Sequence, residues 1–203
     1  MIVKVCGMTQ GENIRAVEAL GADWLGFIFY GPSPRCLCQM PTYLPTRARR
    51  VGVFVHESQE TILRLARLYA LDYIQLHGDE SPDYCHTLQQ QGQQLIKAFS
   101  LSVPADLDQT HSYEGLCSYF LFDTRCPGRG GSGQSFDWSL LQYYNGQTPF
   151  LLSGGLHPDS ASELQAFHHP QWAGIDLNSR FEVAPGVKDP ERISALLMQL
   201  NNK

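Results

Sequence analysis

Two side chains with complementary acid–base chemistry end two apolar segments of the sequence. Cys6 ends the run Ile2–Cys6, and Asp123 ends the run Tyr119–Asp123. A thiol and a carboxyl group that face one substrate from opposite sides can divide the removal and the delivery of a proton. Each has a plainer interpretation when taken singly, because buried cysteines are often inert and an aspartate can cap the next loop. As a pair they predict an acid–base site.

Three further segments predict a binding site for an anion such as phosphate. Glycine lets backbone N–H groups approach an anion closely because no Cβ intervenes. Ordinary turn glycine is the alternative interpretation of any one segment. We expect a helix from near Pro158, and a helix N-terminus is a common phosphate site. The residues of the three segments are Gly131, Ser132 and Gly133; Gly154 and Gly155; and Asn178 and Ser179.

The elements that must position these residues are short apolar runs. Most of the runs are nearly continuous in apolar residues, which is typical of parallel strands that are covered on both faces. We expect eight strands, at Ile2–Cys6, Trp24–Phe29, Val51–Val55, Tyr73–His77, Leu95–Phe99, Tyr119–Asp123, Phe150–Ser153 and Gly174–Leu177.

The segments between these runs predict helices from their capping and breaking residues. The stronger candidates are Gln10–Leu20, Ser58–Ala70, Pro82–Gln91, Trp138–Tyr144, Pro158–Phe167 and Pro190–Leu200. Weaker ones are Pro41–Arg50 and Pro104–His111.

Eight strand–helix units in 203 residues predict a minimal (β/α)8 barrel. The alternative is a doubly wound open sheet, which typically has about six strands and would leave two runs unused. We find no linker or second composition regime, so residues 1–203 are expected to form one α/β domain. In such barrels the active site lies at the C-terminal ends of the strands, where Cys6 and Asp123 fall.

Composition limits the class of protein and its partners. The chain has 15 Lys and Arg against 20 Asp and Glu, a formal net charge of −5, and 43% hydrophobic residues. Such a chain can bury a core, and the lack of a basic block argues against a nucleic-acid partner. Its six cysteines are too sparse for a disulfide scaffold.

The sequence carries no targeting or membrane-spanning pattern. No apolar run approaches the roughly 18 residues that a membrane span needs, and the first residues lack the pattern of a signal peptide. We therefore expect a cytoplasmic protein with no membrane partner. The chain starts at the first strand and ends after the eighth helix, so we expect it to be monofunctional.

Seven motifs, in order along nearly the whole chain, resemble the phosphoribosylanthranilate isomerase family. That family acts in tryptophan biosynthesis on a (β/α)8 barrel, without cofactor or metal. The motifs are Lys4-Val5-Cys6-Gly7-Met8-Thr9, Ser33-Pro34-Arg35, Val51-Gly52-Val53-Phe54, Gln75-Leu76-His77-Gly78, Gly130-Gly131-Ser132-Gly133 with Phe136-Asp137-Trp138, Leu152-Ser153-Gly154-Gly155-Leu156 and Pro185-Gly186-Val187-Lys188-Asp189.

The resemblance implies an Amadori rearrangement of N-(5-phosphoribosyl)anthranilate to 1-(2-carboxyphenylamino)-1-deoxyribulose 5-phosphate. Cys6 is similar to the family's general base, Asp123 to its general acid, and Arg35 to the arginine that pairs with the anthranilate carboxylate. The family's phosphate site corresponds to the three segments described above. For these roles the site should lower the pKa of the Cys6 thiol from ~8.5 and raise the pKa of Asp123 from ~3.9.

Three other residues have more than one interpretation. Asp176, placed with the substrate-binding residues, either takes part in proton transfer or supports the Cys6 side of the barrel mouth. His77 is expected to hydrogen-bond a neighbouring loop rather than to act as the principal base. Arg180 stands where many relatives have glycine. If its φ is positive, the backbone there is strained and the phosphate-binding role of this loop is in doubt. Alternatively, Arg180 itself approaches the phosphate.

Two rival functions stay open. The barrel isomerase of histidine biosynthesis performs the same chemistry but has Asp at the position of Cys6. A non-catalytic phosphate-binding or thiol-redox protein would use Cys36-Leu37-Cys38, and the presence of both Cys6 and Asp123 counts against it. No further Cys or His spacing completes a zinc site. The expected partner is a small phosphorylated substrate, and transient contact with neighbouring enzymes of the pathway stays open.

Overall fold

Eight parallel strands close into a barrel in which each strand is hydrogen-bonded to the next in sequence. The computed structural model describes residues 1–124 and 138–201. The strands are β1 (Ile2–Val5), β2 (Trp24–Ile28), β3 (Arg49–Phe54), β4 (Tyr73–Leu76), β5 (Leu95–Leu101), β6 (Tyr119–Thr124), β7 (Phe150–Leu152) and β8 (Trp172–Leu177). β1 pairs with β8 from Ile2 opposite Gly174 to Val5 opposite Leu177, and this pairing closes the ring. The barrel is confirmed, and the open sheet is excluded.

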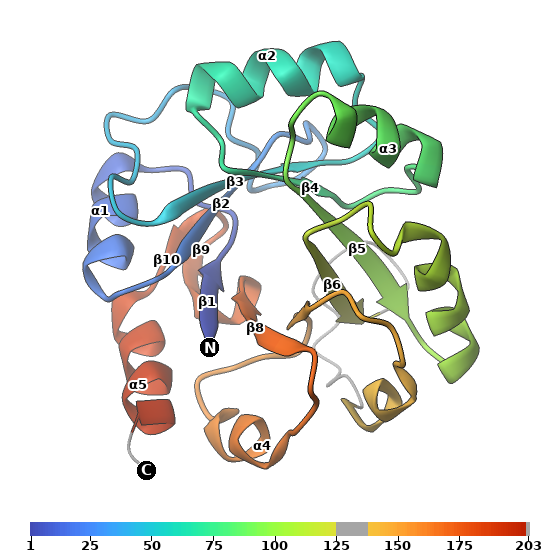
Figure 1. Cartoon of the computed structure of the whole chain (residues 1–203). Coiled ribbons are helices and arrows are strands. Elements are labelled where there is room, and N and C mark those ends of the chain that lie inside the picture. Colours follow the sequence, from blue (N-terminus) through green and yellow to red (C-terminus); the bar gives the residue numbers. More distant parts are fainter. Residues whose placement is uncertain (125–137, 202–203) are drawn as a thin grey trace.

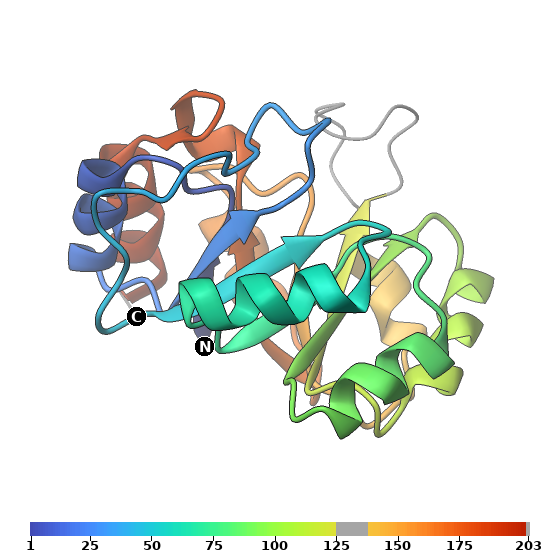
Figure 2. The ribbon, with the colours of Figure 1, turned by 90° about the horizontal axis from the view of Figure 1, so that it is seen from above.

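Helices lie around the outside of the ring of strands, as Figures 1 and 2 show. The α-helices are α1 (Gly11–Ala19), α2 (Gln59–Tyr69), α3 (Pro82–Gln90), α4 (Ala161–Ala166) and α5 (Pro190–Asn201). The 3-10 helices are η1 (Pro104–Tyr113), η2 (Trp138–Tyr143) and η3 (Ser179–Phe181). The expected helix at Pro158 therefore begins three residues later, at Ala161.

The weaker helix prediction for Pro41–Arg50 is wrong. Two prolines in this segment lack the N–H donor that a helix needs. The buried Glu18 carboxylate takes the next three donors: its Oε1 accepts hydrogen bonds from the backbone N–H groups of Thr46, Arg47 and Ala48. A side chain from α1 thus holds the segment in a non-helical form until β3 begins.

A short hairpin after β8, which the sequence analysis did not predict, completes one side of the barrel mouth. Its strands are β9 (Glu182–Ala184) and β10 (Val187–Lys188). Gly186 turns the chain with φ +83°, and its carbonyl accepts a hydrogen bond of 2.8 Å from Thr9 Oγ1. The hairpin thereby brings Glu182 and Lys188 to the end of β1.

The barrel interior changes from apolar to polar along the strands. Trp24, Tyr73 and Tyr119 begin alternate strands, and their rings pack together at the N-terminal end. Because side chains alternate along a strand, residues two positions apart share the interior face. Lys4 therefore lies beneath Cys6, and Gln75 beneath His77, so the polar groups gather toward the C-terminal end.

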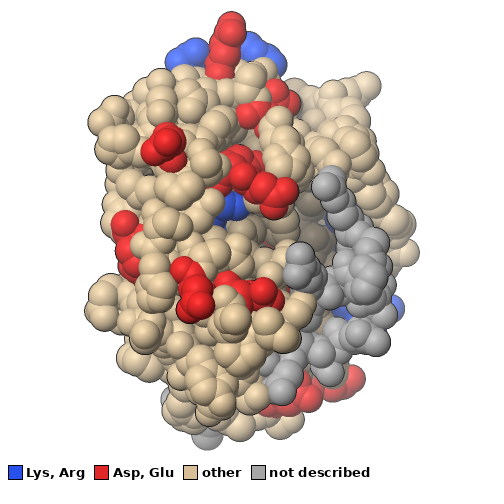
Figure 3. Space-filling model, turned by 90° about the vertical axis from the view of Figure 1, so that its right-hand side faces the viewer, with Lys and Arg blue, Asp and Glu red and all other residues tan. Residues whose placement is uncertain are grey.

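Charged side chains are scattered over the outer surface. On the face in Figure 3, Asp and Glu are spread among uncharged residues and Lys and Arg are few, so its described part shows no basic stripe. Within residues 1–124 and 138–201, no cluster of His, Cys, Asp and Glu could hold a metal ion. The helices in the same ranges are all too short or too polar to cross a membrane.

Candidate active site

Most of the predicted site residues meet at the C-terminal ends of the strands. Cys6 follows β1, Asp123 lies in β6, Asp176 lies in β8, and Arg35 lies in the loop after β2. The remaining residues follow β7 or β8, and these are Gly154, Gly155, Asn178 and Ser179. Gly131, Ser132, Gly133 and Cys126 lie outside the described residues.

The Cys6 thiol is buried close to charged side chains. Cys6 is 3% exposed, and Gly26 of β2 makes room for it, because a Cβ there would lie 2.7 Å from Sγ. Burial raises the pKa of the thiol. Asp176 adds to the rise, while the Lys4 and Lys188 ammonium groups oppose it. The expectation of a lowered pKa is therefore wrong, because the loss of hydration outweighs the two cations.

Lys4 and Asp176 form an ion pair inside the barrel beneath Cys6. Lys4 Nζ donates to Asp176 Oδ1 over 2.9 Å, and both side chains are buried. Burial alone lowers the pKa of Lys4, but the carboxylate and the neighbouring thiol raise it above its ordinary value. The positive charge of the same ammonium group opposes the rise in the pKa of Cys6. This arrangement favours the second role expected for Asp176, support of the Cys6 side of the mouth.

Asp123 faces His77 on the opposite, wetter side of the mouth. The side chains of His77 and Asp123 are 32% and 28% exposed, and His77 Nε2 lies 3.6 Å from Asp123 Oδ2. The other ring nitrogen, Nδ1, lies 2.9 Å from Gln75 Nε2. The expectation that His77 bonds a neighbouring loop is wrong, because its ring is held between its own strand and the carboxyl group of β6.

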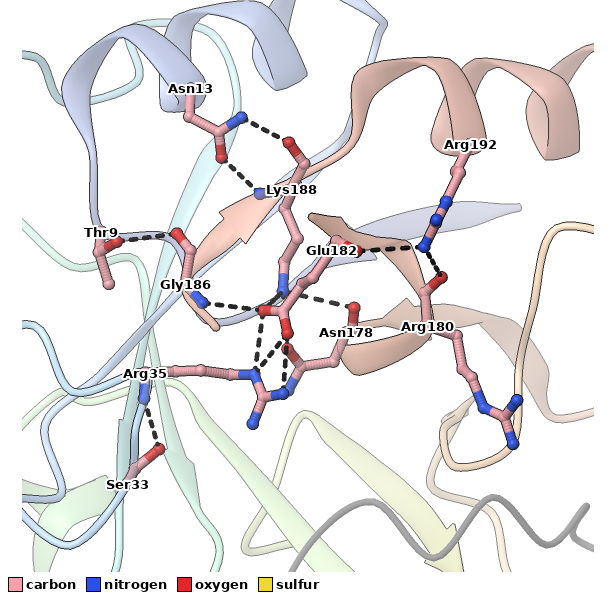
Figure 4. Close-up of polar contacts among 10 residues, drawn as sticks. All are labelled: Thr9, Asn13, Ser33, Arg35, Asn178, Arg180, Glu182, Gly186, Lys188 and Arg192. Carbon is pink, nitrogen blue, oxygen red and sulfur yellow. Dashed lines mark hydrogen bonds and ion pairs between the residues drawn. The ribbon is translucent and has the colours of Figure 1, made fainter. Parts of the chain in front are cut away.

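Arg35 pairs side-on with Glu182 of the hairpin (Figure 4). Arg35 Nε lies 2.9 and 3.0 Å from the two carboxylate oxygens, and Nη2 donates to Oε2 over 2.8 Å. Gly7 permits this position, since a Cβ there would lie 2.9 Å from Arg35 Cδ and its φ is +76°.

Lys188 approaches the same carboxylate from its other side, so that the two cations converge on Glu182 in Figure 4. Lys188 Nζ donates to Glu182 Oε1 over 2.6 Å and to Asn178 Oδ1 over 2.7 Å. Burial lowers the pKa of Lys188, and Glu182 opposes that change. Asn178, predicted to lie near phosphate, is thus a direct partner of this buried ammonium group.

The loops after β7 and β8 contain the residues predicted to bind phosphate. Gly154 and Gly155 have φ of +74° and +72°, a conformation that favours glycine. Arg180 belongs to η3 and does not have a positive φ, so the expected strain is absent. Figure 4 shows its side chain directed away from the Arg35–Glu182 pair.

Three residues of the site were not predicted from the sequence, namely Lys4, Glu182 and Lys188. Lys4 and Lys188 stand inside quoted motifs, so their positions carried a signal. No sequence signal marked Glu182, because only the folding of the hairpin brings it to Arg35. Burial raises the pKa of Cys36, and the neighbouring Cys38 adds to the rise.

Comparison with known proteins identifies the family. The family model described as N-(5'-phosphoribosyl)anthranilate (PRA) isomerase matches residues 3–199. The isomerase of that name from Phocaeicola vulgatus is 54% identical over 203 residues, which cover 100% of this chain and 99% of the relative. The one from Parabacteroides distasonis is 50% identical over 98% of this chain and 93% of its own length.

Solved structures agree with this result. The phosphoribosyl anthranilate isomerase of Thermotoga maritima superposes with a TM-score of 0.88 at 34% identity, over 100% of both chains. A phosphoribosyl anthranilate isomerase in complex with reduced 1-(o-carboxyphenylamino)-1-deoxyribulose 5-phosphate gives 0.84 at 32% identity, again over 100% of both chains. The chain therefore belongs to the N-(5'-phosphoribosyl)anthranilate isomerase family.

Proposed function

We propose that this isomerase converts N-(5-phosphoribosyl)anthranilate to 1-(2-carboxyphenylamino)-1-deoxyribulose 5-phosphate with Cys6 as base and Asp123 as acid. The observation that carries the proposal is the placement of a thiol and a carboxyl group on two sides of one barrel mouth. Both lie at the C-terminal ends of strands, β1 and β6, where barrel enzymes hold their catalytic groups.

The reaction then proceeds through one proton transfer from Asp123, one proton transfer to Cys6 and a tautomerisation. Asp123 protonates the furanose ring oxygen, the C1′–O bond breaks, and the nitrogen lone pair forms the C=N bond of a protonated Schiff base. The Cys6 thiolate removes the C2′ proton, and the electrons of that C–H bond form an enolamine. In the tautomerisation the enol oxygen loses a proton and C1′ gains one, which gives the ketone. Cys6 releases its proton and Asp123 takes one up before the next turnover, so the reaction is a net isomerisation with no exchange of electrons with another molecule.

The surroundings of the two groups suit these roles. A buried thiolate has lost its hydration and is a stronger base than a hydrated one. Lys4 and Lys188 stabilise the thiolate charge when it forms. Asp123, which is 28% exposed and faces His77, can regain a proton from water between turnovers.

Binding of the substrate is assigned to two groups of residues. Arg35 would pair with the anthranilate carboxylate, since a guanidinium can offer two parallel hydrogen bonds. Phosphate would bind at the Gly154-Gly155 turn and the Asn178-Ser179 segment, and Gly131, Ser132 and Gly133 complete this proposed set. Asp176 supports the site from below through Lys4.

The setting of the enzyme is proposed from the sequence. The family's role in tryptophan biosynthesis and the acidic composition together support a cytoplasmic enzyme. Transient contact with neighbouring enzymes of the pathway is a further proposal.

The decisive assay uses the fluorescence of the anthranilate adduct. Adding the protein to freshly formed phosphoribosyl anthranilate should abolish that signal faster than spontaneous breakdown, with formation of the carboxyphenylamino ketose. The corresponding two-phosphate substrate of histidine biosynthesis should not be converted. Conversion of the latter alone would overturn the proposed substrate.

A further inference from the structure

We propose that Glu182 is a positioning residue that holds Arg35 by one edge of its guanidinium, so that the other edge receives the substrate's aromatic carboxylate. The inference rests on the proposed function, because it concerns the same carboxylate. It assigns to the β9–β10 hairpin a part in choosing the substrate.

The contacts leave one edge of Arg35 available. Glu182 occupies Nε and Nη2, at distances between 2.8 and 3.0 Å. Among the described residues, Nη1 has no hydrogen-bond partner, and Figure 4 shows it directed away from Glu182. A second carboxylate can therefore bridge Nη1 and the remaining hydrogen of Nη2 without displacing the first.

Glu182 is itself held too firmly to follow an incoming ligand. Its side chain is only 5% exposed, and it accepts hydrogen bonds from Lys188 Nζ over 2.6 Å and from the Gly186 backbone over 3.1 Å. Burial raises its pKa, but its bonds to Arg35 and Lys188 bring the pKa below its ordinary value, so it stays charged. A carboxylate with this many donors acts as a fixed anchor.

The charges explain why this anchor does not repel the substrate. Arg35 and Lys188 carry two positive charges against the single negative charge of Glu182, and each of the two cations contacts Glu182 directly. One positive charge is left over, which matches one aromatic carboxylate. An Arg–Glu pair alone would be neutral, and its carboxylate would oppose a second one.

The position of the free edge also matches the reaction. Arg35 passes close over Gly7, directly after Cys6, and its backbone N–H is held by Ser33 Oγ over 3.2 Å. The aromatic end of the substrate is thereby fixed on the same side of the mouth as the base.

A competing role for Glu182 would change the affinity for a carboxylate in the opposite direction. If Glu182 merely competed with the substrate for Arg35, removing its charge would tighten binding of a carboxylate. If it positions Arg35, removing its charge should weaken that binding. A purely structural role would change the affinity for ligands with and without the carboxylate equally.

The experiment therefore compares two ligands, the reduced 1-(o-carboxyphenylamino)-1-deoxyribulose 5-phosphate and its analogue made with aniline. Calorimetry should show that Glu182→Gln raises the Kd of the carboxylated ligand by roughly tenfold and leaves that of the aniline analogue within about twofold. With the substrate, KM should rise and kcat should change little. Tighter binding of the carboxylated ligand, or equal changes for both ligands, would overturn the proposal.

Two further variants keep the test decisive. Glu18→Gln is the matched control, because Glu18 is another buried carboxylate that accepts several hydrogen bonds. Glu18 lies away from Arg35 and binds the backbone N–H of Ala48. The Glu18→Gln variant should leave the ratio of the two Kd values unchanged. If Glu182→Gln does not fold, Glu182→Asp keeps the charge but is too short to meet both Arg35 and Lys188. It should raise the Kd of the carboxylated ligand relative to that of the aniline analogue. Failure of the wild type to convert phosphoribosyl anthranilate would instead refute the proposed function.

Discussion

The two sides of the barrel mouth differ in their access to water. On the β1 and β8 side, Cys6 and the buried ion pairs Lys4–Asp176 and Lys188–Glu182 are almost closed to solvent. On the β4 and β6 side, His77 and Asp123 are about a third exposed. The proposed base thus lies in a dry environment and the proposed acid in a wet one.

This difference teaches how one site can supply both a base and an acid. Charged groups that are fixed before the substrate arrives do not have to reorganise during the reaction, and in a dry site their fields are strong. An acid that must be reprotonated in each cycle gains from contact with water. Each side therefore has the environment that its proposed proton transfer requires.

The largest expected effects come from removing one member of the acid–base pair. Cys6→Ser and Asp123→Asn should each lower kcat by about 10²–10⁴, because a hydroxyl is a much weaker acid than a thiol and an amide delivers no proton. Steady-state kinetics with the fluorescent substrate measures this loss, and KM should stay nearly constant. A Cys6→Ser variant with wild-type kcat would remove the thiolate from the mechanism.

The next largest effect concerns binding of the substrate carboxylate by Arg35, next to the buried β1 and β8 side of the mouth. Arg35→Ala should raise KM with little change in kcat, because a carboxylate contact made in both ground and transition states is uniform binding. The expected loss is about 2–5 kcal/mol if the pair is desolvated. The same assay measures it, and an unchanged KM would contradict the assignment. A large fall in kcat would instead mean that Arg35 orients the substrate for proton transfer.

The barrel and its strands could be predicted from the sequence because their signal is local. Continuous apolar runs such as Tyr119–Phe122 mark strands that are covered on both faces, whatever the rest of the chain does. The helix predicted at Pro41–Arg50 failed for the opposite reason. Glu18, more than twenty residues earlier in the chain, takes the backbone donors that a helix would use.

Within the site, residue types could be predicted but their partners could not. Cys6, Asp123 and Arg35 follow strands, and their location at the mouth follows from the barrel. The pairing of Arg35 with Glu182 depends on a hairpin whose strands are too short to show a pattern. The direction of the Cys6 pKa depends on burial weighed against two lysines, which only distances in the folded chain determine.

A smaller effect is expected at the turn after β7, between the two sides. Gly154→Ala should weaken substrate binding and competition by inorganic phosphate, because a Cβ would occupy space beside the backbone donors. The positive φ of Gly154 adds a strain of about 1–2 kcal/mol, so melting temperature must be measured as well.

Gly92→Ala is the matched control for that variant. Gly92 has φ +80° and no atom within 4 Å of the position of an added Cβ. It should lose a similar amount of stability while phosphate competition stays intact. Equal phosphate inhibition in both variants would place the anion site elsewhere.

The smallest effect concerns the dry side itself and appears as a pH dependence of stability. Burial raises the pKa of Cys6 above its ordinary value of about 8.5. Below that value the thiol is protonated in both the folded and the unfolded chain, so its contribution to stability is fully present. As the pH rises further, the unfolded chain releases the proton first, and stability is lost by at most about 1.4 kcal/mol per pH unit.

Urea unfolding from about pH 8 to about pH 10 should therefore show a steeper decline in the free energy of unfolding for the wild type than for Cys6→Ala, which has no thiol to titrate. Parallel declines would mean that the thiol is not in a dry environment, and the contrast between the two sides of the mouth would no longer hold.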